Sequence, residues 1–454
     1  MGSKYEIDMC NGPLLGKMLV FSIPLMLSGV LQLLFNAADI IVVGRFTGRQ
    51  ALAAVGSTGA LINLLINVFL GLSIGTNVLV AQYYGARDLK NLSETVHTSV
   101  LLSFISSIIL VFAGILLAKP MLSLMGTPDD VLDQAAVYMR IYFAGMPVIM
   151  FYNFGSAILR AIGDTKRPLY FLLIAGIVNV LLNLFFVIVF QMGVAGVALA
   201  TVLSQCISAG LVLRCLLLAD GPYQVHWKEL RLSKSKLLQI IRTGLPAGIQ
   251  GAIFSISNVL IQSSVNSFGS IAMAGNTAAS NLEGFVYTCM NAIYQTSLNF
   301  TSQNMGARQY QRIHQILIRA LVIVTAVGVG LSAAALPFSR QLLGIYSSDP
   351  AVIEYGLSRM SVFFTTYFIC GLMDVCCGSI RGLGYSIMPT IVSLAGACGL
   401  RILWIFTIFN WSHSLFTLYL SYPVSWGVTF VAHLICYGIA MKKLKASAQP
   451  VQVG

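Results

Sequence analysis

The stretch Met18–Gly44, MLVFSIPLMLSGVLQLLFNAADIIVVG, decides the fold class of this chain. A helix of about 20 apolar residues, rising about 1.5 Å per residue, is long enough to cross a bilayer, and this stretch exceeds that length. Lys17 and Arg45 bound it, and one carboxylate, Asp39, lies inside it. Because a charge within a membrane span costs about 3 kcal/mol or more, such a residue is seldom retained without a function.

The composition extends this interpretation to the whole chain. Of its 454 residues 57% are hydrophobic and only 9% are charged, and the mean hydropathy is +0.84. Soluble domains carry about 25% charged residues, so the sequence predicts an all-α, polytopic membrane protein. Most of the nine cysteines lie in apolar segments, where they act as small apolar residues. We expect no disulfide framework, no metal site of Cys or His, and no cofactor other than a transported ion.

Twelve apolar segments, each long enough to span a membrane, are predicted at 18–44, 51–80, 96–118, 134–159, 168–190, 194–218, 237–265, 272–301, 315–338, 351–380, 389–410 and 414–441. The loop 219–236 would join an N-terminal six-helix lobe, 1–218, to a C-terminal six-helix lobe, 237–454. Basic residues collect in alternate loops, and the sparse side holds only Arg45, Arg49, Lys119 and Arg340. The positive-inside rule then places both termini in the cytoplasm, and we expect a bacterial inner membrane.

The two halves repeat with a constant offset, under which positions 51, 81 and 159 correspond to 272, 302 and 380. The matching pairs are AQYYGARDLKNL (81–92) with SQNMGARQYQRI (302–313), LRAIGDTKRP (159–168) with IRGLGYSIMP (380–389), and ALAA (51–54) with AMAG (272–275). Six helices per half give a parallel repeat about an axis along the membrane normal, with substrate expected at the interface between repeats. In the two GAR turns we expect Gly85 and Gly306 to supply the permissive backbone.

On these residues the chain resembles the multidrug and toxic compound extrusion (MATE) family. The features that carry the resemblance are NAADIIVVGR (36–45), the two GAR turns, LRAIGD and IRGLGY, and VNVLLN (178–183), in this order among twelve helices. The resemblance implies a secondary antiporter that exports organic, often cationic, multidrug-type compounds in exchange for Na⁺ or H⁺. It also implies a coupling site formed by Asp39, Asn179 and Thr201. Many relatives have an aspartate where this chain has Asn183.

Helical spacing gives the same residues a shared surface. Asn179 and Asn183 lie one turn apart, as do Asn36 and Asp39. Their oxygens suit a hard cation, so Na⁺ could bind at Asp39, Asn179, Asn183 and Thr201. Burial disfavours a charged carboxylate, so Asp39 could equally carry a proton. A third alternative is a structural hydrogen bond between Asp39 and Asn179.

Polar stripes on other helices are candidates for a substrate cleft. Amide stripes can line a cavity or join helices; those assigned to the cleft are Asn63, Asn67, Asn258, Gln262, Asn281 and Gln295. Two further acids, Glu283 and Asp374, could bind a cationic substrate or a second ion. Asp374 could instead pair with Arg401, which could otherwise contact an anion. Arg359 is expected to extend its charge to the membrane interface.

Three other classes of protein compete with this assignment. A lipid-linked-precursor flippase or polysaccharide exporter of the same superfamily would need several cationic residues facing its cleft, and only Arg401 is deep. A channel would conduct without coupling. A membrane enzyme is disfavoured because Ser/His/Asp sets, HExxH, P-loop and CxxC motifs are missing. The expected partners are a small organic substrate and membrane lipid. Nucleic acid is not expected, because the charge of +12 follows the loop pattern, and we expect a monomer.

Overall fold

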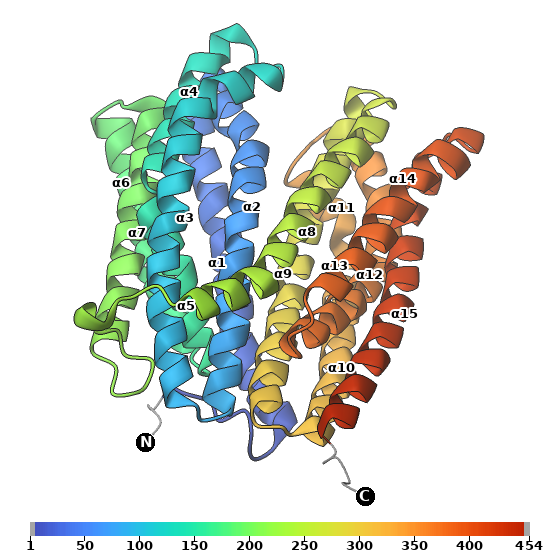
Figure 1. Cartoon of the computed structure of the whole chain (residues 1–454). Coiled ribbons are helices and arrows are strands. Elements are labelled where there is room, and N and C mark those ends of the chain that lie inside the picture. Colours follow the sequence, from blue (N-terminus) through green and yellow to red (C-terminus); the bar gives the residue numbers. More distant parts are fainter. Residues whose placement is uncertain (1–4, 449–454) are drawn as a thin grey trace, which may run out of the picture. The chain divides into compact units, whose positions relative to one another are not determined.

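A computed structural model describes residues 5–448 of the chain (Figure 1). Within these residues all regular structure is helical and no strand occurs. Of the helices within residues 5–448, ten are long and apolar enough to cross a membrane, or eleven if the bent pair α4 (Asp129–Ala144) and α5 (Met146–Ala161) counts as one span. The all-α, polytopic prediction is confirmed. The predicted segment 272–301 lies in α9 (Ser270–Gly306), which is long enough to span but rich in polar residues.

The helices form two compact units. Within the described residues, unit 1 comprises 5–8 and Leu27–Ala252, and unit 2 comprises Met9–Met26 and 253–448. Two helices therefore contribute to both units, namely α1 (Leu14–Phe46) and α8 (Lys234–Asn266). The units divide inside these helices, whereas the predicted division falls in the loop 219–236.

The other long helices belong to one unit each. Unit 1 also contains α2 (Arg49–Gly85), α3 (Leu89–Leu124), α4, α5, α6 (Lys166–Leu184) and α7 (Gly193–Leu217). Unit 2 also contains α9, α10 (Tyr310–Ala335), α11 (Ser339–Gly344), α12 (Pro350–Gly382), α13 (Ile387–Ser393), α14 (Leu400–Trp404) and α15 (Leu415–Ala448).

The repeat seen in the sequence recurs in the helix boundaries and in the turns. Helices α2 and α9 begin at corresponding positions, Arg49 and Ser270, and end at corresponding positions, Gly85 and Gly306. Left-handed backbone occurs at pairs with the same offset: Gly48 and Gly269 (φ 99° and 94°), Arg87 and Arg308 (55° and 56°), and Gly163 and Gly384 (98° and 92°). The expectation for the GAR turns was wrong in one respect, because the arginine and not the glycine adopts the left-handed conformation.

The predicted span 134–159 is broken in the structure, whereas its counterpart in the second half is continuous. Helices α4 and α5 meet at a bend of 50° beside Gly145. Pro147 lacks the N–H that would continue the helical ladder, and a Cβ at Gly145 would lie only 2.4 Å from Val202 Cγ2. The counterparts of Gly145 and Pro147 in the second half are Thr366 and Phe368, which allow α12 to run unbroken.

Unit 1 includes the first part of α8 because the backbones of α8 and α2 are in direct contact there. A Cβ built on Gly71 would lie 2.3 Å from Gly248 N, and one on Gly75 would lie 2.4 Å from Ile240 O. A Cβ on Gly244 would in turn lie 2.5 Å from Gly71 O. Small residues at one-turn spacing on both helices permit this approach, as in other membrane helix pairs. This contact holds residues 234–252 on unit 1.

We expect Gly71→Ala to destabilise unit 1 by about 1–3 kcal/mol, because the new methyl group has no space between the two backbones. The measurement is the thermal unfolding midpoint of the purified chain in detergent. Gly59→Ala, on the same helix, is the matched control, because a Cβ there meets nothing within 4 Å. Equal midpoints for the two variants would contradict the packing argument.

Candidate functional site

A chain of hydrogen bonds in unit 1 joins the residues predicted to form the coupling site. Asn183 Nδ2 donates to Asp39 Oδ1 and, at 3.2 Å, to Asn179 Oδ1. Asn179 Nδ2 donates to Thr201 Oγ1 at 3.4 Å, and Thr201 Oγ1 donates to the carbonyl oxygen of Val197 at 3.0 Å. The chain of bonds crosses α1, α6 and α7, of which α6 and α7 lie side by side (Figure 1).

A close contact between α1 and α6 places Asp39 at this site. A Cβ on Gly176 would lie 1.8 Å from Phe35 Cε2, so only glycine lets the ring of Phe35 lie against α6. Asp39 follows Phe35 by one turn, and Asn179 and Asn183 follow Gly176 by one and two turns on the same face. The ring-to-glycine contact therefore sets the carboxylate opposite the amides.

Burial and nearby groups define the electrostatics of this site. Asn183 is fully buried, Asn179 is 6% exposed, and Asp39 is half-buried. The buried Asn183 Oδ1 accepts no hydrogen bond from any residue in the described part of the chain. Tyr138 and Tyr142 of α4, whose rings stack at 6.2 Å, both interact electrostatically with Asp39.

Sequence reasoning missed these two tyrosines. Their spacing of one turn within a predicted span was the available signal. Asn36, which was assigned to the coupling site, lies exposed on α1 within unit 1 and outside this chain of bonds.

Glu283 and Arg359 form a buried ion pair in unit 2. Arg359 Nε donates to Glu283 Oε1 at 2.8 Å, and Arg359 Nη2 donates to Glu283 Oε2 at 2.7 Å. Glu283 is 3% exposed and Arg359 is 6% exposed. The expectation that Arg359 extends to the membrane interface was wrong, because its charge is compensated inside the unit. A substrate cation at Glu283 would have to compete with this bidentate pair.

The ion pair belongs to a larger hydrogen-bonded network, which includes Gln262 from one of the predicted polar stripes. Arg359 Nη1 donates to Asn276 Oδ1 at 2.7 Å, and Asn276 Nδ2 donates to Gln262 Oε1 at 3.0 Å. Gln262 therefore joins helices, which is one of the two roles considered for it. Gln295 Nε2 donates to Asn291 Oδ1 at 3.3 Å within α9.

The remaining amides assigned to the cleft lie elsewhere. Asn258 and Asn281 are exposed within unit 2, and Asn63 is exposed within unit 1. Asn67 faces Gly251 within unit 1. The structure leaves their role in a cleft as a prediction.

Asp374 and Arg401 do not form the ion pair that was considered for them. Among the described residues, no carboxylate oxygen lies within 4.0 Å of the Arg401 guanidinium. Asp374 interacts electrostatically with Tyr287, Arg381 and Arg401. It is half-buried, so it is more accessible than Glu283.

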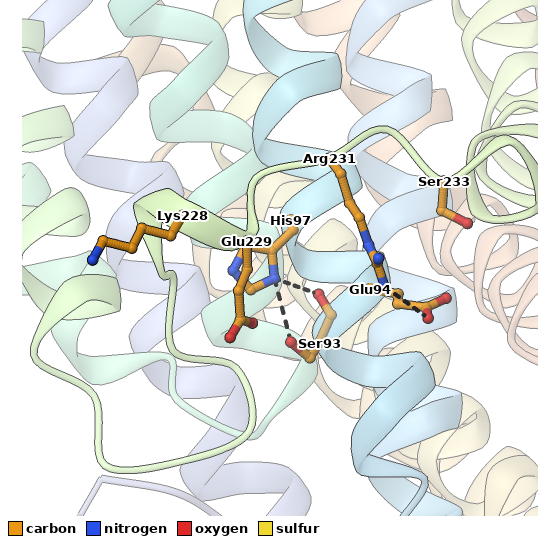
Figure 2. Close-up of a pocket in the computed structure, with 7 residues that line it drawn as sticks. All are labelled: Ser93, Glu94, His97, Lys228, Glu229, Arg231 and Ser233. Carbon is orange, nitrogen blue, oxygen red and sulfur yellow. Dashed lines mark hydrogen bonds and ion pairs between the residues drawn. The ribbon is translucent and has the colours of Figure 1, made fainter.

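A pocket of about 360 Å³ lies where the loop 219–236 crosses α3 (Figure 2). His97 holds the loop: its Nδ1 donates to Ser93 O at 2.8 Å, and its Nε2 accepts from the backbone N–H of His226 at 3.0 Å. Figure 2 shows Arg231 directed at Glu94, 3.5 Å away. Lys228 and Glu229 add one further charge of each sign, so the lining does not select an ion of either sign.

The oxygen ligands available for a cation are limited. Within residues 5–448, no group of three His, Cys, Asp or Glu side chains comes together. The residues predicted to form the coupling site offer one carboxylate, two amide oxygens and one hydroxyl. The amide nitrogens of Asn179 and Asn183 point along the chain of bonds.

Comparisons with known proteins agree with this fold. The model of the MatE family matches residues 24–185 and 246–407, one stretch in each half of the chain. The chain is 27% identical to "Probable multidrug resistance protein YoeA" of Bacillus subtilis, over 93% of this chain and 92% of that protein. It is 25% identical to "FAD transporter" of Shewanella oneidensis, over 72% and 74%.

A solved structure shares the fold over almost the whole chain. It is described as the outward-facing conformation of a multidrug resistance MATE family transporter of the MOP superfamily. The chain matches it with a TM-score of 0.91 at 21% identity, over 98% of this chain and 100% of that chain.

Proposed function

Since the chain belongs to the MatE family, whose members are membrane transporters, we propose that it is a secondary active antiporter. In this proposal it exports organic compounds of the multidrug type and takes up one proton at Asp39 for each transport cycle. The two units alternate between states open to either side of the membrane. The family supports transport, and the names of the relatives support efflux of drugs.

The observation that carries the proposal is the chain of hydrogen bonds that begins at Asp39. A carboxylate kept inside a membrane span is costly unless it serves a function. Here it is bound to Asn183, which is fully buried and whose Oδ1 has no partner among the described residues. Protonation turns Asp39 from an acceptor into a donor, so a protonated Asp39 could satisfy that oxygen.

This change links protonation to conformation. The helices that carry Asp39, Asn183 and Thr201 are three different ones, so exchanging a donor for an acceptor alters how they are held together. An ion shifts a conformational equilibrium only by its different affinity for the two states. A tenfold shift needs about 1.4 kcal/mol, which is within the range of one charge-assisted hydrogen bond.

The atoms available as ligands at this site favour a proton over Na⁺. A hard cation is held by several oxygens directed at one point. At this site the amide groups of Asn179 and Asn183 present nitrogen atoms along the bonds, and only Asp39 carries a formal negative charge. Na⁺ remains the second candidate, with Asp39, Asn179, Asn183 and Thr201 as ligands.

For a cationic substrate, Asp374 is a better candidate than Glu283. Arg359 occupies both oxygens of Glu283, whereas Asp374 is more accessible. We further propose a monomer in a bacterial inner membrane with both termini in the cytoplasm. The distribution of Lys and Arg among the loops supports this orientation.

The test is efflux of a cationic dye from proteoliposomes under an imposed pH gradient and, separately, an imposed Na⁺ gradient. We expect the pH gradient alone to drive efflux, and a protonophore to stop it. Efflux driven by Na⁺ alone would overturn proton coupling and favour the cation site. If neither gradient drives efflux of any cationic dye, the antiporter proposal fails and the flippase assignment becomes the better one.

A further inference from the structure

Arg401 in unit 2 is a buried charge that the proposed function does not use. It lies on α14, a short helix between the π-helical segments η4 (Leu394–Gly399) and η5 (Ile405–Phe409). It is 7% exposed and, as shown above, has no carboxylate partner in the described part of the chain. An arginine stays charged, and π-helical segments often occur at functional sites.

The guanidinium of Arg401 makes a hydrogen bond at one edge and contacts aromatic rings with one face. Arg401 Nε donates to Ser425 Oγ at 2.9 Å, and Ser425 Oγ donates onward to the carbonyl oxygen of Tyr422 at 2.8 Å. The guanidinium carbon lies 4.3 Å from the ring centroid of Tyr422 and 5.6 Å from that of Trp426. The terminal nitrogens donate to no residue within 5–448. They are the paired donors that recognise a carboxylate or phosphate.

Unit 2 also contains a buried arginine, Arg359, whose charge is compensated by an acidic partner. Arg359 also lies over aromatic rings, with its guanidinium carbon 4.1 Å from the Phe363 centroid. All three of its nitrogens donate, however, to Glu283 and Asn276. The contrast shows that this fold can satisfy a buried arginine completely, and that at Arg401 it does not.

The repeat places Arg401 at a meaningful position. At the offset that relates the two halves, Tyr422 is the counterpart of Thr201, and Arg401 is the counterpart of Val180, the neighbour of Asn179. Arg401 and Tyr422 thus lie on the segments of unit 2 that correspond to those bearing the Asn179–Thr201 hydrogen bond in unit 1, and Leu400, next to Arg401, is the counterpart of Asn179. In unit 1 the charged residue beside these segments is the acid Asp39, whereas in unit 2 one of the segments itself carries a positive charge.

Aromatic rings continue from this position toward the exposed side of unit 2. The rings of Trp426 and Tyr367 lie 5.5 Å apart, and those of Tyr367 and Tyr287 lie 6.4 Å apart at 28°. Tyr287 is 38% exposed. Flat aromatic faces of this kind stack well on a planar ligand.

We propose that Arg401, supported by Tyr422 and Trp426, binds the carboxylate or phosphate of an aromatic organic anion. The anion is a substrate of the transporter, so this inference rests on the proposed function for the fate of the ligand. Binding itself needs no ion gradient, and it can be tested apart from transport.

The experiment is equilibrium binding of radiolabelled 2-naphthoate to the purified full chain in a neutral detergent, beside 2-naphthylmethylammonium, which has the same ring and the opposite charge. We expect Arg401→Gln to weaken naphthoate binding about tenfold or more, since charge-assisted hydrogen bonds are lost. Binding of the cationic compound should not weaken. Arg401→Lys should retain part of the affinity, because it keeps the charge without the planar fork.

Two control variants separate the site from general effects. Arg340→Gln removes the same charge from an exposed residue of unit 2 and should leave naphthoate binding unchanged. Asp133→Asn removes a charge from an exposed residue of unit 1 and should also bind naphthoate normally. Because binding is measured without an ion gradient, a failure of the coupling proposal would not affect this test. The thermal unfolding midpoint of each variant shows whether Arg401→Gln folds. If Arg401→Gln does not fold, the naphthoate affinity of Arg401→Lys is the test.

Three outcomes would overturn the proposal. They are unchanged naphthoate affinity in Arg401→Gln, equal loss for the anionic and cationic compounds, and absence of naphthoate binding by the wild type. A lipid phosphate is the other source of this chemistry. If phosphatidylglycerol in the detergent micelle binds in an Arg401-dependent manner and naphthoate does not, Arg401 is a lipid site and the substrate assignment is wrong.

Discussion

Asp39→Asn is expected to abolish export driven by a pH gradient while leaving the protein folded. The asparagine has nearly the same shape, and its oxygen can still accept the hydrogen bond that Asn183 donates. It cannot gain or lose a proton, so the network has only one state at every pH. Without a state that depends on the ion, the gradient has nothing to act on.

The measurement is dye efflux from proteoliposomes for wild type and variant at equal protein content. Exchange of labelled for unlabelled dye, without any gradient, should persist in Asp39→Asn, which distinguishes lost coupling from lost folding. Asp133→Asn is the matched control, because that aspartate is exposed and paired with Lys119 at 2.7 Å. Export by Asp39→Asn that still responds to the pH gradient would rule out the coupling role.

The grouping of Asp39, Asn179, Asn183 and Thr201 could be predicted because most of its signal was local. Asn179 and Asn183 lie one turn apart on one helix, and the resemblance supplied Asp39 and Thr201 on two others. Helical spacing and an intramembrane charge were enough to select Asn179, Asn183 and Asp39, whereas Thr201 was selected by the resemblance alone. The structure joins all four by hydrogen bonds. Their function in coupling stays a prediction. The contact of Phe35 with Gly176 that brings them together could not be seen, because spacing does not show which helix faces meet.

The pairing of Glu283 with Arg359 was missed because each residue was considered alone. Glu283 lies between three and four turns from the start of α9, and Arg359 lies between two and three turns from the start of α12. In the predicted topology both helices run in the same direction, and each turn rises by the same amount, so the two charges lie at similar depth. Opposite charges at one depth in a membrane usually find each other. That comparison of depths was the available signal.

Arg359→Gln is expected to destabilise unit 2 by about 3–5 kcal/mol, because removing one partner of a buried ion pair leaves the other charge without compensation. That other charge is Glu283, which is nearly inaccessible to water. The variant also loses the hydrogen bond to Asn276 Oδ1. The measurement is the unfolding free energy in mixed micelles, followed by tryptophan fluorescence. Trp426 contributes to this signal and packs on Phe363 next to Arg359.

The double variant Glu283→Gln with Arg359→Gln is the decisive comparison. It removes both charges and keeps two amides that can bond to each other, so it should be more stable than Arg359→Gln alone. If the double variant is instead as unstable as the sum of the two single variants, the pair contributes no coupling energy. Glu283 would then be maintained by other contacts, and its predicted place in the substrate cleft would regain support. Recovery in the double variant would leave Asp374 as the acid in this unit that is available to a substrate cation.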